Sequence, residues 1–323
     1  MSVDSGEQAA LWAVRERSVG LLGRVAGVRK PVPFVEDTVV PPEHLADYIK
    51  EFRALLDRHG VSYGMFGHVD VGCLHVRPTL NMKDPADRER LRAITEEVVV
   101  LVKRYGGLLW GEHGKGYRGE FTRDFFGERL YPVLSGIKRS FDPGNRLNPG
   151  KIVTPDPSGS GVIAVDGVPF RGEFDNRIPA EDQARWAKAL ECNGNGVCFD
   201  WSATTTICPS YKVTRDRVHS PKGRADLLRE WLRREAAPQP AWGVDNQQER
   251  DRFAHEVYAA LHGCLGCKAC ASQCPVQVDI PTLRSRFLQR YHRRYHRPLR
   301  DQLIARIEAL APLLSWWPRL TNG

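Results

Sequence analysis

A run of four closely spaced cysteines constrains this chain more than any other feature of its sequence. Residues 264–275 read Cys-Leu-Gly-Cys-Lys-Ala-Cys-Ala-Ser-Gln-Cys-Pro, which is a C-x2-C-x2-C-x3-C-P pattern. This pattern is typical of proteins that bind 4Fe-4S clusters, where three thiolates hold one cluster and the fourth ligates another. A tetrahedral zinc site is the alternative, but zinc sites usually join two separated C-x2-C halves. The run therefore predicts a cluster-binding segment.

A second, incomplete copy of the pattern lies upstream. Cys192, Cys198 and Cys208-Pro209 fit the same spacing, but Asn195 occupies the position of the second cysteine. Because the last cysteine of one run usually ligates the cluster of the other run, we expect one complete set of ligands, which is Cys208, Cys264, Cys267 and Cys270. The reciprocal set has three thiolates, which are Cys192, Cys198 and Cys274. Three thiolates are compatible with a 3Fe-4S cluster, with a 4Fe-4S cluster that has an unusual fourth ligand, or with no cluster.

The cysteine distribution and the apolar segments indicate the compartment. Seven of the eight cysteines fall between Cys192 and Cys274, and no stretch approaches the roughly 18 apolar residues of a membrane helix. The residues after Met1 carry acids and lack the apolar run of a secretory signal. We therefore expect a cytoplasmic protein without a transmembrane segment, whose cysteines ligate clusters rather than form disulfides.

The C-terminal part of the chain is strongly basic. Residues 281–323 contain nine arginines against two acids, Asp301 and Glu308, in a chain whose net charge is +8. Apolar side chains recur there at helical spacing, at Leu299, Leu303, Ile307 and Leu310. We expect a basic amphipathic helix that docks on another domain, a partner subunit or an anionic surface such as the inner face of the membrane. Nucleic acid is not an expected partner, because no recognition motif accompanies the charge.

The first half of the chain alternates helical and strand-like patterns. The hydrophobic periodicity predicts helices over residues 43–58 and 84–105 and strands over residues 61–66, 73–76 and 108–110. Such alternation predicts an α+β layer in which helices cover one face of a sheet.

Turn formers and composition predict the domain boundaries. The turn-rich segment 141–152 closes a first domain of residues 1–153, and a linker rich in Pro, Gly and Ser follows over residues 154–184. Helical patterns over 223–236 and 248–262 make the next domain mostly helical. We assign this domain to residues 185–282 and the basic tail to residues 283–323.

Histidine and carboxylate residues gather at two points of the first domain. His68 and His75 are seven residues apart and would face opposite sides of one unbroken strand, but the Asp-Val-Gly turn between them can bring both imidazoles to one site. Glu112 and His113 lie in a second, glycine-rich segment. Two histidines and one carboxylate form the ligand set of a catalytic divalent metal. From spacing alone, unrelated loop histidines remain the alternative.

Three longer motifs carry a family resemblance. Residues 66–78 (FGHVDVGCLHVRP), 106–119 (GGLLWGEHGKGYRG) and 141–152 (FDPGNRLNPGKI) resemble the C-terminal half of the FAD-linked oxidases that act on D-2-hydroxy acids. The resemblance spans roughly residues 10–153 and implies a ferredoxin-like oxidase C-terminal domain. The cysteine region, over roughly residues 185–285, resembles the alpha-helical ferredoxin type of respiratory dehydrogenases. Together with residues 32–42 (VPFVEDTVVPP), the chain resembles the large bacterial fusion proteins of the D-2-hydroxyglutarate or D-lactate dehydrogenase type.

The resemblance implies roles for individual residues. His68, His75 and Glu112 fall on the family's ligands for a divalent metal (Zn, Mn or Fe), and His113 falls on the general base beside the flavin. Arg15 falls on an arginine that binds the substrate carboxylate. Arg77 stands where the family usually has asparagine, and its planar guanidinium could clamp a second carboxylate.

The resemblance also implies cofactors and partners. FAD would accept hydride from a small 2-hydroxy acid, and electrons would pass to the 4Fe-4S cluster and on to an acceptor protein or quinone. The segment 111–116 opens no clear helix, so it is not a dinucleotide fingerprint. We therefore expect FAD to be bound mostly by a missing N-terminal FAD domain, with this chain as a fragment that binds FAD weakly and is inactive alone.

Two functions fit these features. The leading interpretation is part of a flavin-dependent 2-hydroxy-acid dehydrogenase, because His68, His75, Glu112 and His113 are all present. The alternative is a non-catalytic iron-sulfur electron-transfer subunit that docks a separate flavoprotein.

Overall fold

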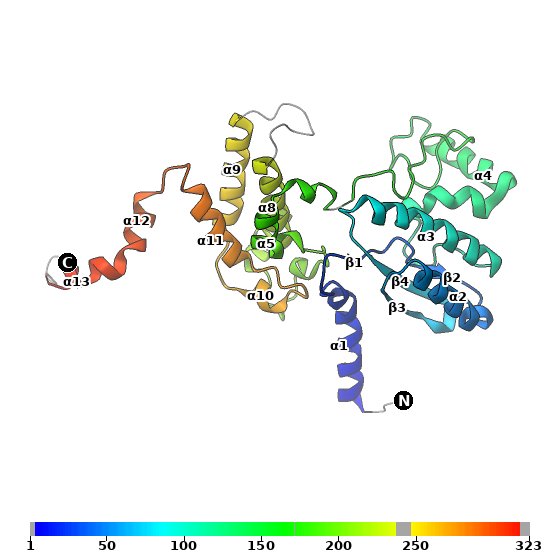
Figure 1. The fold of residues 1–323 in the computed structure, drawn as a ribbon, viewed down its shortest axis with the longest axis horizontal. Helices are drawn as coiled ribbons and strands as arrows, with labels where there is room; N and C mark the ends of the chain where they lie inside the picture. Colours follow the sequence, from blue (N-terminus) through cyan, green and yellow to red (C-terminus); the bar gives the residue numbers. More distant parts are fainter. Residues whose placement is uncertain (1–3, 171, 237–246, 317–323) are drawn as a thin grey trace. The chain divides into compact units, whose positions relative to one another are not determined.

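The computed structural model describes residues 4–170, 172–236 and 247–316, and the chain forms two compact units (Figure 1). The first unit is Met1–Pro179 and the second is Ala180–Gly323. The division falls inside the segment 154–184 that the sequence suggests as a linker. Each unit is described by itself below.

The first unit is an α+β layer, as expected. Its helices are α1 (Ser5–Leu22), α2 (Leu45–Arg58), α3 (Pro85–Arg104) and α4 (Thr122–Phe141), and the 3-10 helix η3 (Gly116–Phe121) leads into α4. α2 buries the apolar face that the periodicity predicts, including Tyr48 and Phe52. α3 begins where Asp84 accepts a hydrogen bond from the N–H of Ala86, with Pro85 in the first turn, which is a favourable helix start.

A small antiparallel sheet is built around one strand, β4 (Cys73–Leu80). β3 (Tyr63–His68) pairs along one edge of β4. Two short strands, β1 (Lys30–Pro31) and β2 (Thr38–Val39), pair with the two ends of its other edge. Side chains alternate between the faces of a strand. Leu74, Val76 and Leu80 therefore point into the hydrophobic core, while Cys73, His75 and Arg77 lie on the opposite face.

The segment between β1 and β2 leaves the edge of the sheet and then returns. The N–H of Val32 still donates to the carbonyl of Pro78 at 2.9 Å, and the N–H of Asp37 donates to the carbonyl of Leu74 at 2.9 Å. Asp37 adopts a left-handed backbone conformation (φ 77°), which is uncommon for a residue other than glycine. This break brings Glu36 and Asp37 to the face of the sheet that carries His75.

The strand expected over residues 108–110 is wrong. Only Leu108 pairs, in an isolated bridge with Val39. The next backbone hydrogen bond runs from the N–H of Gly111 to the carbonyl of Asp37. The backbone turns away from the strand direction at Asp37, so strand pairing does not continue. Leu109 and Trp110 are buried nonetheless, so the apolar run indicates core packing rather than a strand.

The second unit is helical over its described residues. Its helices are α5 (Ala180–Arg185), α6 (Ala187–Leu190), α7 (Pro209–Thr214), α8 (Pro221–Ala236), α9 (Gln247–His262), α10 (Ala269–Gln273), α11 (Ile280–Tyr291), α12 (Leu299–Ala305) and α13 (Ile307–Ser315). An aromatic core joins α8 and α11 to Trp186, which lies between α5 and α6. Trp231 of α8 lies 5.6 Å from the ring of Trp186 and 4.9 Å from that of Phe287 in α11.

The basic tail differs from the expected single amphipathic helix. α11 crosses the expected boundary between residues 282 and 283, and Leu283, Phe287 and Tyr291 are buried in the helical unit. The apolar stripe beyond it is divided between α12 and α13, which Arg306 separates. Because that stripe is exposed, no packing holds one continuous helix there. Among the described residues, no helix is long and apolar enough to cross a membrane.

Candidate active site and cluster pocket

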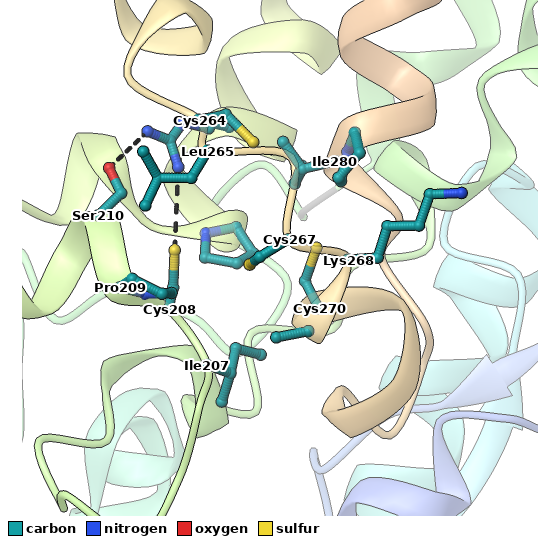
Figure 2. A pocket seen from close by; sticks show the side chains of 14 residues that line it. Ile207, Cys208, Pro209, Ser210, Cys264, Leu265, Cys267, Lys268, Cys270 and Ile280 are labelled. Atoms are coloured by element: carbon teal, nitrogen blue, oxygen red, sulfur yellow. Dashed lines mark hydrogen bonds between the residues drawn. The ribbon is translucent and has the colours of Figure 1, made fainter.

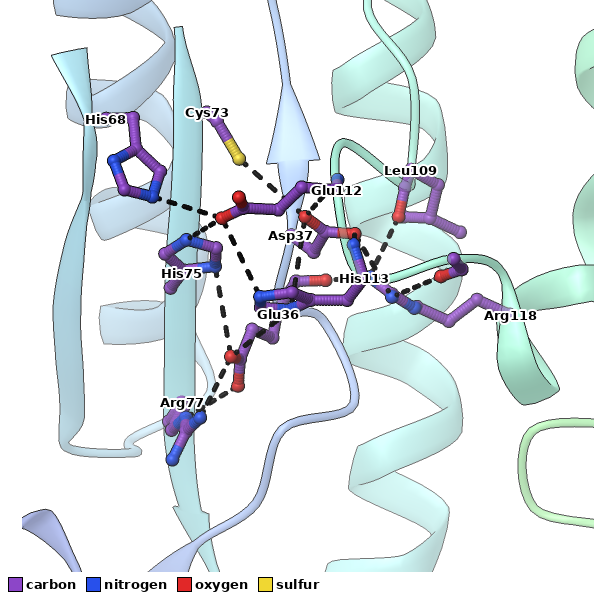
Figure 3. Close-up of polar contacts among 11 residues, drawn as sticks. Glu36, Asp37, His68, Cys73, His75, Arg77, Leu109, Glu112, His113 and Arg118 are labelled. Atoms are coloured by element: carbon purple, nitrogen blue, oxygen red, sulfur yellow. Dashed lines mark hydrogen bonds and ion pairs between the residues drawn. The ribbon is translucent and has the colours of Figure 1, made fainter. Parts of the chain in front are cut away.

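Two histidines and a glutamate converge on the face of the sheet opposite the hydrophobic core of the first unit (Figure 3). Oε1 of Glu112 lies 3.1 Å from Nε2 of His68 and 2.9 Å from Nε2 of His75. The strand register explains why both rings share a face. His75 lies opposite Phe66 in the β3–β4 pair, and His68 lies two residues after Phe66, so all three point to the same side.

Two of the three distances among these donor atoms fit a divalent cation. Bonds of about 2.0–2.2 Å from nitrogen and carboxylate oxygen to a metal place neighbouring donors about 3 Å apart. The distances from Oε1 of Glu112 to His68 and His75, 3.1 and 2.9 Å, match that spacing, but the ring nitrogens of His68 and His75 do not lie within 4.8 Å of each other. Among the described residues, the groups whose donor atoms all lie within 4.8 Å of one another are Asp37, Cys73, His75 and Glu112, and Glu36, His75 and His113. Burial and the neighbouring His113 hold the pKa of His75 below its usual value. A neutral imidazole is the form that binds metal.

His113 lies directly beside this group. Its ring stacks on that of His75, with centroids 4.7 Å apart and planes at 17°. Its Nε2 lies 3.7 Å from Oε1 of Glu112, and its Nδ1 lies 3.6 Å from Oε1 of Glu36. The side chain is 46% exposed. A histidine so placed can reach a molecule that enters from solvent.

Sequence reasoning missed Asp37 and Arg118, which hold the Glu112-His113 turn. The buried carboxylate of Asp37 accepts hydrogen bonds from the backbone N–H of Glu112 at 2.8 Å and of His113 at 3.0 Å. Arg118 pairs with the same carboxylate at 3.4 Å and donates to the carbonyls of Gly114 and Leu109, each at 3.0 Å. The available signal was an acidic pair inside the apolar run VPFVEDTVV, since acids are rarely buried without a partner.

Of the two arginines predicted to bind substrate, the structure describes the side chain of Arg77 but not that of Arg15. Arg77 forms a two-pronged ion pair with Glu36, with its Nε 2.5 Å from Oε2 and its Nη2 2.9 Å from Oε1. Its guanidinium therefore already holds a carboxylate of the chain itself. Arg15 lies in α1, but its side chain is outside the described part of the structure. Both roles in substrate binding stay predictions.

Four cysteines of the second unit line one pocket (Figure 2). They come from separate segments, and they are the predicted set Cys208, Cys264, Cys267 and Cys270. Cys208 precedes α7, Cys264 follows α9 and Cys270 lies in α10. Apolar groups such as Ile207 and Ile280 contribute to the lining of this pocket.

The thiols of this set are not placed as they would be around a single zinc ion. A tetrahedral zinc site with bonds of about 2.3 Å places its sulfur atoms about 4 Å apart. Among the described residues, no three cysteines have sulfur atoms all within 4.8 Å of one another. A 4Fe-4S cube binds each thiolate at a different iron and so holds them further apart.

The incomplete cysteine group is also buried. Burial, together with the nearby Cys192 and Cys274, raises the pKa of the Cys198 thiol to about 11. Asn195 does not join this group. Its side-chain oxygen accepts from the N–H of Val197 at 3.1 Å in a local turn, and the residue is exposed.

Comparison with known proteins places both halves in families. Residues 1–152 match the family "FAD linked oxidases, C-terminal domain", and residues 188–278 match the "4Fe-4S dicluster domain". The chain is 53% identical to D-2-hydroxyglutarate dehydrogenase of Escherichia coli K12 and 52% identical to that of Pantoea ananatis, in each case over 97% of this chain and 33% of the relative. It is 32% identical to a D-lactate dehydrogenase of Archaeoglobus fulgidus over 39% of this chain and 28% of that protein. The chain thus spans about a third of the length of its most similar relatives named here. It joins a C-terminal domain of the FAD-linked oxidases to a 4Fe-4S dicluster domain.

Proposed function

We propose that this chain supplies the metal site and an iron-sulfur relay of a flavin-dependent dehydrogenase for D-2-hydroxy acids. The observation that carries the proposal is the convergence of His68 and His75 on Oε1 of Glu112, with the ring of His113 stacked beside them. The names of the relatives, D-2-hydroxyglutarate and D-lactate dehydrogenases, support this substrate class. The alternative of a non-catalytic electron-transfer subunit gives no reason for so many metal-binding groups to meet.

The residues of the candidate site in the first unit then have distinct chemical roles. His68, His75 and Glu112 would hold a divalent cation (Zn, Mn or Fe), and a bound cation together with flavin would supply hydroxyl activation and a hydride acceptor. His113 accepts the hydroxyl proton as general base, because it lies beside the donor group and reaches solvent. Asp37 and Arg118 fix the turn that carries both Glu112 and His113.

The substrate arginines complete the proposed site. Arg15 is proposed to bind the carboxylate next to the hydroxyl group. Arg77 is proposed to bind a second carboxylate, as 2-hydroxyglutarate would present, in exchange for Glu36. Its present two-pronged pair with Glu36 supports this role, since the same fork geometry suits any carboxylate.

The second unit would carry the electrons away. We propose that Cys208, Cys264, Cys267 and Cys270 ligate one 4Fe-4S cluster, since all four line one pocket. Its electrons would go to an acceptor protein or quinone. We also propose a cytoplasmic location, because all eight cysteines are free thiols, as expected in a reducing compartment.

Two measurements on the chain test this function. After anaerobic purification, we expect about four irons per chain and one EPR signal on reduction if only the complete set is filled, or seven to eight irons if both sites are filled. After loading with Zn²⁺ or Mn²⁺, calorimetry should detect D-2-hydroxyglutarate binding at least about tenfold tighter than its L enantiomer, and His75→Asn should abolish it. His44→Asn is the control, because His44 precedes α2 and takes no part in the site.

The outcomes separate the two candidate functions. A cluster without metal-dependent binding of any 2-hydroxy acid would favour the electron-transfer subunit. Zinc in place of iron would remove the electron relay and leave the dehydrogenase proposal dependent on the first unit alone.

A further inference from the structure

One arginine in the second unit is buried without an acidic partner. Arg224, near the start of α8, is 1% exposed. Its Nε donates to the carbonyl of Ala260 at 2.8 Å, and its Nη2 donates to the hydroxyl of Ser210 at 2.8 Å. Both acceptors are neutral. Within the described part of the chain, Arg224 forms no ion pair with aspartate or glutamate, although a buried charge is costly unless it is paired.

The remaining nitrogen of this guanidinium faces a thiol. Nη1 of Arg224 lies 4.0 Å from Sγ of Cys208, and both residues line the pocket that also contains Cys264, Cys267 and Cys270 (Figure 2). In Figure 2, the dashed lines that end on Ser210 and Cys208 mark these contacts of the guanidinium. Since no carboxylate of the described residues balances this cation, the pocket is the place to look for a bound anion.

We propose that Arg224 is the buried counter-charge of the 4Fe-4S cluster and raises its reduction potential. This inference rests on the proposed ligand set. A cube held by four thiolates carries net negative charge, and that charge grows by one when the cluster takes up an electron. A fixed cation beside one ligand stabilises the reduced form more than the oxidised form, and an N–H donor to sulfur acts in the same direction.

The anchors of Arg224 keep the charge in place. Ala260 belongs to α9 and Ser210 to α7, so the side chain ties three helices together around the pocket. A Cβ at Gly263 would lie 3.4 Å from Nη2, which is a tight contact, so glycine leaves room for the guanidinium.

Two substitutions at one position test the proposal. Arg224→Gln removes the charge but keeps a hydrogen-bonding amide, and Arg224→Lys keeps the charge but loses the planar fork. The matched control is Arg252→Met, which removes one positive charge from α9 at a side chain that is 68% exposed. For each protein, anaerobic preparations give the iron content, the EPR signal of the reduced cluster and the midpoint potential by redox titration.

We expect Arg224→Gln to make the cluster at least tenfold harder to reduce, which is a negative shift of 59 mV or more for one electron. Arg224→Lys should shift the potential in the same direction by less than half as much, and Arg252→Met should leave it unchanged. A loaded Arg224→Gln protein with the wild-type potential would overturn the proposal. If Arg224→Gln retains no iron, the Arg224→Lys variant tests the proposal instead. A small negative shift of the midpoint potential in iron-loaded Arg224→Lys supports the counter-charge. A shift of 59 mV or more, which is a tenfold change in the reduction equilibrium, or loss of iron from Arg224→Lys contradicts it.

The same experiment separates this inference from the proposed function. A wild-type protein without iron and without a reduced-cluster EPR signal would refute the ligand set itself. A wild-type protein with a normal cluster, whose potential does not respond to Arg224→Gln, would refute only the role of Arg224.

Discussion

Replacing Asp37 by asparagine should destabilise the first unit strongly, although the two side chains have nearly the same shape. Asp37 is completely buried and pairs with Arg118, whose side chain is 11% exposed. Removing one partner of a buried ion pair leaves the other charge uncompensated, which typically costs about 3–5 kcal/mol. Arg118 keeps its hydrogen bonds to the carbonyls of Gly114 and Leu109, so we expect about 3 kcal/mol.

Hydrogen exchange measured by mass spectrometry on peptides from β4 gives the opening free energy of this unit separately from the helical unit. The control is Asp47→Asn on α2, whose carboxylate is 71% exposed and should change stability by less than about 0.5 kcal/mol. In the double variant with Arg118→Met, the two costs should not add, because both changes remove the same pair. A loss below about 1 kcal/mol for Asp37→Asn would show that the pair does not hold the Glu112-His113 turn.

The pH dependence of this effect has a definite sign. Burial tends to raise the pKa of Asp37, but the hydrogen bonds from Glu112 and His113 and the charge of Arg118 outweigh burial, so the pKa lies below its usual value. A lowered pKa in the folded state contributes stability above the unfolded pKa of about 3.9, and this contribution disappears as the pH falls through the folded pKa. The difference in the free energy of unfolding between wild type and Asp37→Asn should therefore be constant from about pH 5 to 8 and should become smaller below about pH 4.

Further predictions concern the cluster, the helical core and the turn after α4. Cys270→Ser should reduce the iron content of the anaerobic protein by more than half, while Cys73→Ser, outside both cysteine groups, should leave it unchanged. Trp186→Ala should cost the second unit about 3–5 kcal/mol in urea unfolding, because the side chain is 1% exposed and packs on an aromatic core. Asp142 accepts hydrogen bonds from Lys138 and from the backbone after α4, and these lower its pKa to about 2. The destabilisation by Asp142→Asn should therefore be full at pH 7 and should fade as the pH drops from about 4 to about 2, and a difference that persists at pH 2 would contradict this assignment.

The sequence predicts best what depends on local spacing. The cysteine run 264–275 places three ligands in one short segment. The fourth ligand, Cys208, could be assigned from the sequence because the last cysteine of one run usually ligates the cluster of the other run, and Cys208 lines the same pocket. That His68 and His75 lie on a common face was harder to predict, since it depends on the register of β3 against β4. The turn between them places both rings beside Glu112, but their ring nitrogens do not lie within 4.8 Å of each other.

The sequence predicts poorly what depends on long-range backbone contacts. The tie from Asp37 to the N–H groups of Glu112 and His113 joins residues 75 and 76 positions apart. It also requires Asp37 to take a positive φ, which sequence reasoning expects mainly at glycine. The failed strand at 108–110 has the same cause, because the backbone that it would pair with turns away at Asp37.

Arg224 differs from two partly buried arginines of the first unit in the groups that it contacts. In the first unit, Arg118 faces Asp37 and Arg77 faces Glu36, so each cation is balanced by an acid of the chain itself. In the second unit, Arg224 is more deeply buried and meets only neutral oxygens and a thiol. Because an unpaired buried charge is costly and no carboxylate of the described residues pairs with Arg224, the proposed balancing anion is a group bound in the adjoining pocket. A cluster held by four thiolates in the adjoining pocket provides that negative charge, and the redox titration of Arg224→Gln measures how strongly the two are coupled.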